Sequence, residues 1–196
     1  FPSRAVVACQ GIEGAYSQLA CDKIFSLPQI MYFNRFDGVF RAVENGMCRY
    51  GILPIENSSA GSVTEVYDLI EKYDCKIVRS LKLKIDHCLL ALPGVRLEDV
   101  KEVVAHEQAL DQCGEFLKNN KIKITVFNNN AAAAKYVSES GRKDIAAIAS
   151  ENCADLYNLK IISQRIANSD HNYTRFICIS KSLEIFEGAN KITFVA

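Results

Sequence analysis

The chain has 196 residues, of which 49% are hydrophobic and 23% are charged, and its 23 basic and 23 acidic residues give zero net charge. This composition is typical of a soluble globular protein with one good core or two small lobes. The balanced charge argues against a nucleic acid or a membrane surface as the main partner, and no apolar run approaches the about 20 residues of a membrane span.

In the first 80 residues, strand-like and helix-like segments alternate. Residues 36–45 carry Val39, Phe40 and Val43 at helical spacing, and Gly46 ends the segment. The predicted strands are 5–9, 30–33 and 50–55, and the predicted helices are 16–25, 36–45 and 62–73. Repeated strand–helix–strand units of this kind predict a largely parallel sheet with helices on both faces.

Two long extended segments, 76–92 and 161–179, enclose a second αβ pattern. Its predicted strands are 103–104, 122–127 and 145–148, and its predicted helices are 109–117, 131–138 and 151–157. Asn130 is the expected N-cap of the helix that follows it. We therefore expect an α/β protein with two αβ lobes and a cleft between them, in which ligands bind at strand ends and helix starts. The predicted lobes are 1–82 with 166–188, and 83–165.

Eight cysteines are spread along the chain, and none forms a C-x-x-C pair. Most stand in apolar segments, as Cys9 and Cys178 do. In a chain with this much core they indicate reduced, mostly buried thiols of a cytoplasmic protein. Their spacing also weighs against a zinc site. Cys113 is the thiol that lies beside a candidate site.

Polar motifs stand where the first and third strands end. The glycine-containing turn at 11–17, which ends at Ser17, can offer backbone N–H groups to an anion, or it can be a tight turn without a ligand. The loop at 54–62 contains Glu56, Asn57 and Ser58. One such residue would serve to cap the next helix, so the number of polar groups favours a binding site.

A second set of polar residues begins the helix that follows strand 103–104. His106 is a candidate general acid, an anion contact or a helix cap, and taken alone the structural role is favoured. Gln108, near the helix start, is suited to donate to a carboxylate. Gln112 lies one turn further along the same face.

The segment 172–176 combines a hydroxyl, a guanidinium and aromatic rings before an apolar strand. Thr174 and Arg175 suit a small anionic substrate. In a regular strand Thr174 and Phe176 share a face and Arg175 points the opposite way. Arg175 therefore reaches the same pocket only if the strand begins after Thr174, or if it acts from behind.

Taken together and in this order, these motifs resemble the catalytic domain of prephenate dehydratases, including the related arogenate dehydratases of plants. The resemblance covers essentially the whole chain and is carried by residues 11–17, 40–46, 54–62, 87–90, 106–113, 146–150 and 174–176. Three of the chain's motifs depart from the family pattern. Residues 105–108 read Ala-His-Glu-Gln where Ser-His-Pro-Gln is usual, residues 166–168 read Ile-Ala-Asn where Ile-Gln-Asp is usual, and Asn130 replaces a common threonine.

The resemblance implies a fold similar to type II periplasmic binding proteins, with the active site between the lobes. It also implies a homodimer and a C-terminal ACT domain that binds phenylalanine, of which residues 189–196 would be the start. The start at Phe1 without a methionine and the strand-like end indicate a fragment, and in many bacteria a chorismate mutase domain precedes the dehydratase.

The implied reaction is the loss of carbon dioxide and water from prephenate to give phenylpyruvate, in phenylalanine biosynthesis. Aromatisation drives it, so neither a cofactor nor a metal is expected. Thr174 would donate to the departing hydroxyl, with Glu56 or His106 feeding a proton relay. The expected substrate-binding residues are Ser17, Asn57, Ser58, Gln108, Arg175 and Phe176. The alternatives are arogenate as the substrate, or a non-enzymatic two-lobed sensor.

Overall fold

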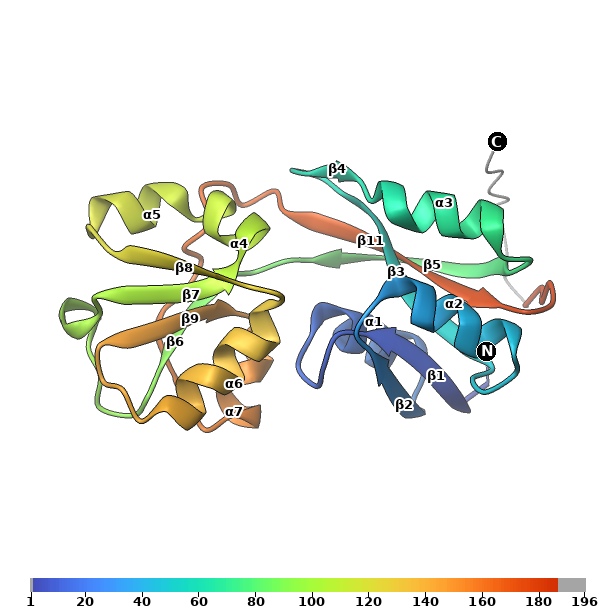
Figure 1. Cartoon of the computed structure of the whole chain (residues 1–196), viewed down its shortest axis with the longest axis horizontal. Coiled ribbons are helices and arrows are strands. Elements are labelled where there is room, and N and C mark those ends of the chain that lie inside the picture. Colours follow the sequence, from blue (N-terminus) through green and yellow to red (C-terminus); the bar gives the residue numbers. More distant parts are fainter. Residues whose placement is uncertain (1, 187–196) are drawn as a thin grey trace.

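The computed structural model describes residues 2–186, which form two lobes that are each built on a mixed sheet (Figure 1). The strand order is β2-β1-β3-β11-β5 in the first sheet, with β4 paired to β3, and β10-β6-β9-β7-β8 in the second. In the part of the chain described here, no helix is long and apolar enough to cross a membrane.

The first lobe contains β1 (Arg4–Gln10), α1 (Tyr16–Ile24), β2 (Leu27–Phe33), α2 (Phe36–Glu44), β3 (Tyr50–Asn57), β4 (Gly61–Ser62), α3 (Thr64–Lys72), β5 (Lys76–Lys84) and β11 (Tyr173–Ser180). The second contains β6 (Cys88–Ala91), β7 (Glu102–His106), α4 (Glu107–Gln112), α5 (Gly114–Asn119), β8 (Lys123–Phe127), α6 (Asn130–Ser140), β9 (Ile145–Ala149), α7 (Asn152–Leu156) and β10 (Lys160–Ser163), with a short 3₁₀ turn at Leu97–Asp99.

The two sheets are mixed because the chain leaves the first lobe and returns to it. β1 pairs in parallel with β2 and β3, as predicted. β11 comes back from the second lobe, so it inserts antiparallel between β3 and β5. The parallel pairing predicted from the first 80 residues thus holds for β1, β2 and β3, whereas β5 and β11 pair antiparallel, as β6 does with β9 and β10 in the second lobe.

β5 and β11 lie side by side and extend from the first lobe toward the second (Figure 1). The segments 85–87 and 164–172 complete the two crossings. β5 continues to Lys84, beyond the boundary predicted at residue 82, and its Leu83 pairs with Thr174 in the first sheet. The expected beginning of an ACT domain at 189–196 lies outside the described residues.

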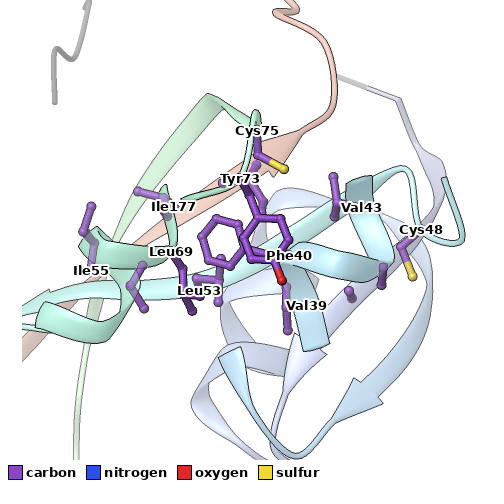
Figure 2. Close-up of a cluster of buried hydrophobic side chains, with 14 residues drawn as sticks. Val39, Phe40, Val43, Cys48, Leu53, Ile55, Leu69, Tyr73, Cys75 and Ile177 are labelled. Atoms are coloured by element: carbon purple, nitrogen blue, oxygen red, sulfur yellow. The ribbon is translucent and has the colours of Figure 1, made fainter. Parts of the chain in front are cut away.

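The core of the first lobe is packed beneath α2 and α3 (Figure 2). The spacing that predicted helix 36–45 places Val39, Phe40 and Val43 in this core, each almost fully buried. Phe40 stacks on Tyr73 with ring centroids 5.6 Å apart. The second lobe packs α6 on its sheet through the small side chains of Ala133 and Ala134. All eight cysteines are free and buried, which confirms the prediction of buried thiols.

The predicted helices differ from the structure most clearly at three points. The segment 109–117 is two helices, which meet at Cys113, where the backbone leaves helical geometry. The N-cap of α6 is Asn129, whose Oδ1 accepts from the Ala132 N–H at 2.7 Å, and not Asn130. The Asn130 carboxamide instead accepts from the His106 N–H at 2.8 Å. α3 begins at Thr64 because residues 61–62 pair with β3.

Candidate active site

A cavity of about 150 Å³ lies between the two lobes. The first lobe contributes the end of β1, the start of α1, one residue of β3 and one of β11. The second contributes the end of β7, the start of α6 and the region before α7. Its lining residues are Gln10, Gly14, Ala15, Tyr16, Ser17, Pro54 and Phe176 from the first lobe and His106, Asn129, Asn130, Ala131, Ser150 and Cys153 from the second. The predicted position of the cleft, at strand ends and helix starts, agrees with this geometry.

The first turns of two helices line this cavity, α1 through Tyr16 and Ser17 and α6 through Asn130 and Ala131. The first turn of a helix carries a partial positive charge from its unpaired N–H groups. Two such ends, one from each lobe, make the cavity suitable for a ligand with two negative groups.

The glycine-containing turn is packed against the opposite lobe. Gly14 has a φ of 91°, and a Cβ there would meet the Cys153 Sγ at 2.9 Å and Leu156 Cδ2 at 3.0 Å. Its carbonyl accepts from Ser150 and Cys153, and its N–H donates to the Gln18 side chain at 2.7 Å. This N–H is therefore already paired, and the turn holds α7 close to the cavity.

A chain of polar side chains lies where the crossings leave the first lobe. The Asn57 Nδ2 donates to the Thr174 Oγ1 and to the Asn172 Oδ1, both at 2.9 Å. The Asn172 Nδ2 donates to the Gln112 Oε1 at 2.8 Å, and His87 Nε2 lies 2.7 Å from the same oxygen. The two bonds from Asn57 are buried, and the two bonds to the half-buried Gln112 are partly buried.

The orientation of the Asn57 amide follows from two backbone contacts. Its Oδ1 accepts from the N–H groups of Ser59 and Ala60, at 2.9 and 3.0 Å. Those N–H groups can only donate, so Nδ2 must be the end that faces Thr174. The Thr174 oxygen thus accepts a hydrogen bond, and its own O–H is left to donate elsewhere.

The predicted catalytic and binding residues are brought together only in part. His106, Phe176 and Ser17 line the cavity, and Asn57 and Thr174 belong to the polar chain beside it. Ser17 donates its hydroxyl proton to the Gln10 carbonyl at 2.5 Å, so it faces a ligand as an acceptor. The His106 Nδ1 accepts from the Gln108 N–H at 3.3 Å, as in the capping role, which leaves Nε2 as the ring's donor.

Arg175 and Glu56 lie on the outer face of the sheet. They are register partners on β11 and β3, and the Arg175 Nε lies 3.4 Å from the Glu56 Oε2. Their side chains are 50% and 53% exposed, whereas Thr174 and Phe176 on the same strand are buried. Side chains alternate between the two faces of a strand, so Arg175 points away from the cavity, as expected. Glu56, its partner on β3, lies on the same outer face.

Ser58 and Gln108 also lie outside the lining of this cavity. The Ser58 hydroxyl donates to the His171 carbonyl and accepts from the Tyr173 N–H, both at 2.9 Å. Ser58 thus ties the end of β3 to the start of β11. Gln108 is half-buried in the first turn of α4, and its backbone N–H donates to the ring of His106, the N-cap residue of that helix.

Several residues of the site carried no functional assignment from the sequence. Gln112 and Asn172 line a second cavity of about 290 Å³, on which Ser59 and Asn168 also border. Thr174 lies on β11, two residues after Asn172, which lines the second cavity, and two residues before Phe176, which lines the first cavity. The sequence did contain a signal for these residues: His87 and Asn172 are polar residues inside long extended segments.

Burial controls the protonation of the groups around the polar chain. Desolvation lowers the pKa of His87, so its ring is neutral at neutral pH. Desolvation also raises the pKa of Tyr16 well above its usual value, and that of Cys113 to about 12. Cys113, the thiol beside the predicted site, is therefore a protonated core residue and not a reactive thiolate.

The two sheets and this cavity define a two-lobed α/β protein with a cavity between its lobes. A ligand-binding component of an ABC-type import system from Staphylococcus aureus superposes with a TM-score of 0.50 at 14% identity, over 92% of this chain and 67% of that one. The architecture is thus similar to that of periplasmic binding proteins.

The family profile of prephenate dehydratase matches residues 7–184, and the chain belongs to the prephenate dehydratase family. It is 40% identical over 179 residues to arogenate dehydratase/prephenate dehydratase 1, chloroplastic, of Arabidopsis thaliana, covering 91% of this chain and 46% of that protein. It is 39% identical to arogenate dehydratase 2 of Petunia hybrida, covering 96% of this chain and 48% of the relative. The chain thus spans about half the length of these relatives.

Two solved structures extend the comparison. A prephenate dehydratase from Arthrobacter aurescens in complex with L-Phe has a TM-score of 0.86 at 24% identity, over 94% of this chain and 63% of that one. A protein described as GqqA, a novel type of quorum quenching acylase, has a TM-score of 0.83 at 30% identity, over 94% of this chain and 67% of that one.

Proposed function

We propose that this chain is the catalytic part of a prephenate dehydratase, which converts prephenate to phenylpyruvate, carbon dioxide and water in phenylalanine biosynthesis. The observation that carries the proposal is the direction of the bond between Asn57 and Thr174, which leaves the Thr174 O–H to donate. The substrate carries two carboxylates and a ring hydroxyl, and the cavity offers two helix starts and a hydroxyl donor next to it.

In the proposed reaction the ring carboxylate leaves as carbon dioxide, and its electron pair enters the ring. The ring hydroxyl on the opposite carbon departs and takes a proton, so that water is formed. An alcohol is a weak acid at neutral pH, so Thr174 acts as an aimed hydrogen-bond donor to the leaving oxygen or as a relay. His106, in the cavity lining, is the candidate proton source of that relay: a ring that has taken a second proton from solvent would give one up and return to its neutral form.

The remaining binding roles are assigned by position. The starts of α1 and α6 hold the carboxylates, and Phe176 forms the apolar wall that keeps water from the ring. Of the remaining candidates, only His106 lines the cavity. We rank Thr174 and Asn57 next, because both are buried and Thr174 shares a strand face with Phe176, which lines the cavity. Below them rank Arg175, Glu56, Ser58 and Gln108.

Arogenate is the second candidate substrate, because relatives that are 39–40% identical are named arogenate dehydratases. Arogenate carries an amino group where prephenate has its side-chain keto group. Turnover of both compounds by the same preparation decides between them. Tight binding without turnover of either would favour a sensor.

Acyl hydrolysis, suggested by the acylase among the similar structures, fits the site less well. Such chemistry requires a nucleophile activated by a base. The Thr174 oxygen is bonded to the Asn57 amide, which is not a base. Burial raises the pKa of the Cys113 and Cys153 thiols and so disfavours their thiolate forms.

Exchange of Thr174 tests the proposal. Thr174→Val keeps the shape and removes the hydroxyl, and it should lower kcat about 10²- to 10³-fold, the usual loss of one aimed donor. Thr174→Ser should retain kcat within about tenfold, and the exposed Thr64→Ala serves as the control. Phenylpyruvate is read by its absorbance in alkali. Near wild-type turnover by a folded Thr174→Val variant would refute the role of the hydroxyl.

The assignments that concern the whole protein belong to the same proposal. We infer a homodimer, an ACT domain that binds phenylalanine, and a cytoplasmic location in keeping with eight free, buried thiols. The Arthrobacter aurescens relative that was solved with L-Phe supports phenylalanine as the effector. Residues 1–196 alone should then be insensitive to phenylalanine, and clear inhibition of this piece would contradict the ACT assignment.

A further inference from the structure

His87 lies at the far end of the polar chain, in the segment that joins β5 to β6. Its side chain is buried, and its Nδ1 is a buried atom without a hydrogen-bond partner among residues 2–186. The ring lies edge-on to Tyr16, with centroids 6.3 Å apart, and the His87 carbonyl accepts from the Ile166 N–H of the other crossing. His87 is thus fixed where the two crossings meet and lines neither cavity.

The proton on the His87 ring follows from the bonds along the chain. Asn57 Nδ2 donates to the Asn172 Oδ1, so the Asn172 Nδ2 is the end that donates to Gln112. The Gln112 atom that receives this bond must be its Oε1. His87 Nε2 lies 2.7 Å from that oxygen, so it must carry a proton and donate as well.

The other tautomer would be costly at both ends of the ring. With the proton on Nδ1, two lone pairs would face each other between His87 and Gln112 at 2.7 Å. The Nδ1–H would also be buried without an acceptor. Because burial disfavours the charged ring, the neutral Nε2–H form is the one that fits.

We propose that His87 is a positioning residue for the dehydration reaction: its Nε2–H holds the Gln112 amide, which holds Asn172 and, together with the backbone N–H groups of Ser59 and Ala60, keeps Asn57 in the orientation that makes the Thr174 hydroxyl a donor. This inference rests on the proposed function. The Gln112 Nε2 also lies 3.4 Å from the Asn57 Oδ1, so a turned Gln112 amide would oppose both asparagines at once. In such a chain each amide fixes the orientation of the next one, because a donor must face an acceptor. The orientation set at His87 can therefore affect Asn172, which is far from it in the sequence.

The test compares two replacements of His87. His87→Leu removes the donor, so it should lower kcat by about tenfold or more and change KM less than threefold, because His87 does not line the cavity. His87→Gln can return an N–H near the position of Nε2, and it should restore kcat to within about threefold of the wild-type value. His171→Gln, at an exposed histidine, is the matched control.

Two results would overturn the proposal. One is an unchanged kcat in a folded His87→Leu variant, and the other is a His87→Gln variant that is as slow as His87→Leu. If His87→Leu does not fold, the tautomer of His87 can still be read from the ring ¹⁵N NMR signals of the wild type. These signals are assigned by their loss in His87→Gln. A proton on Nε2 supports the proposal, and a proton on Nδ1 or a doubly protonated ring at pH 7 refutes it.

Failure of the proposed function gives a different result. The wild type and His171→Gln would then both lack turnover of prephenate and of arogenate. The ¹⁵N measurement reports the His87 tautomer in either case, so the two failures are distinguishable.

Discussion

Asn57→Asp should reverse the direction in which the Thr174 hydroxyl donates. The change replaces Nδ2 by an oxygen of the same size, at a side chain that is 7% exposed. The other carboxylate oxygen keeps the bonds from Ser59 and Ala60. The new oxygen can only accept, so the Thr174 O–H turns toward it and away from the substrate.

The stability cost can be worked from the bonds that change. The donor bonds to the Asn172 Oδ1 and the Tyr173 carbonyl are lost, at about 1 kcal/mol each, and the buried Asn172 oxygen is left unpaired at about 1–3 kcal/mol. Stronger, charge-assisted bonds from the two backbone N–H groups offset about 1–2 kcal/mol. We expect a net loss of about 1–4 kcal/mol, which a domain of ordinary stability survives.

The effect on turnover should be larger than the effect on folding. Loss of the Thr174 donor should reduce kcat about 10²-fold or more. The assay is phenylpyruvate absorbance in alkali at saturating prephenate, with urea unfolding to confirm the fold. Asn119→Asp, an exposed residue at the end of α5, controls for the added charge. An Asn57→Asp variant that is folded and retains kcat within threefold would refute the donor argument.

Three further predictions concern packing, lobe contact and charge. Phe40→Ala empties a fully buried site and should cost about 3–5 kcal/mol in urea unfolding, whereas the 58% exposed Met47→Ala should change stability by less than about 0.5 kcal/mol; equal costs would contradict the packing in Figure 2. Gly14→Ala and Gly46→Ala both place a side chain at positive φ, which should cost about 1–2 kcal/mol of stability in each case. Of the two, only Gly14 faces the other lobe. Gly14→Ala should therefore raise KM and Gly46→Ala should not, and an equal KM in the two variants would argue against the contact with Cys153. Hydrogen bonds from Thr125 and Arg142 lower the pKa of Glu102, so its contribution is present above the ordinary glutamate pKa of about 4.3 and is lost as pH falls through the lowered pKa. The stability difference between the wild type and Glu102→Gln, about 1 kcal/mol or less at pH 7, should shrink as the pH falls below the ordinary glutamate pKa, and a difference that does not change with pH would contradict the assignment.

Local patterns predicted the elements well where a helix or strand has one buried face. The spacing of Val39, Phe40 and Val43 marks α2 because a helix repeats every 3.6 residues, whatever it packs against. The same reasoning failed at Cys113, because the predicted helix 109–117 runs through Gly114, which in the structure begins a separate helix, α5. It made no prediction of the direction of β11, because the direction of a strand depends on the path of the chain before it and not on the local pattern.

By itself, the sequence determined the family, the alternation of elements, the two lobes, and the opposite faces that Thr174 and Arg175 take in a regular strand. These follow from motif order and from periodicity, which are local properties. Only the tertiary structure decided which polar groups meet. It joins His87, Gln112, Asn172 and Asn57 to Thr174. The direction of each bond depends on partners up to 117 residues apart, so the donor role of Thr174 cannot be read from residues 172–176 alone.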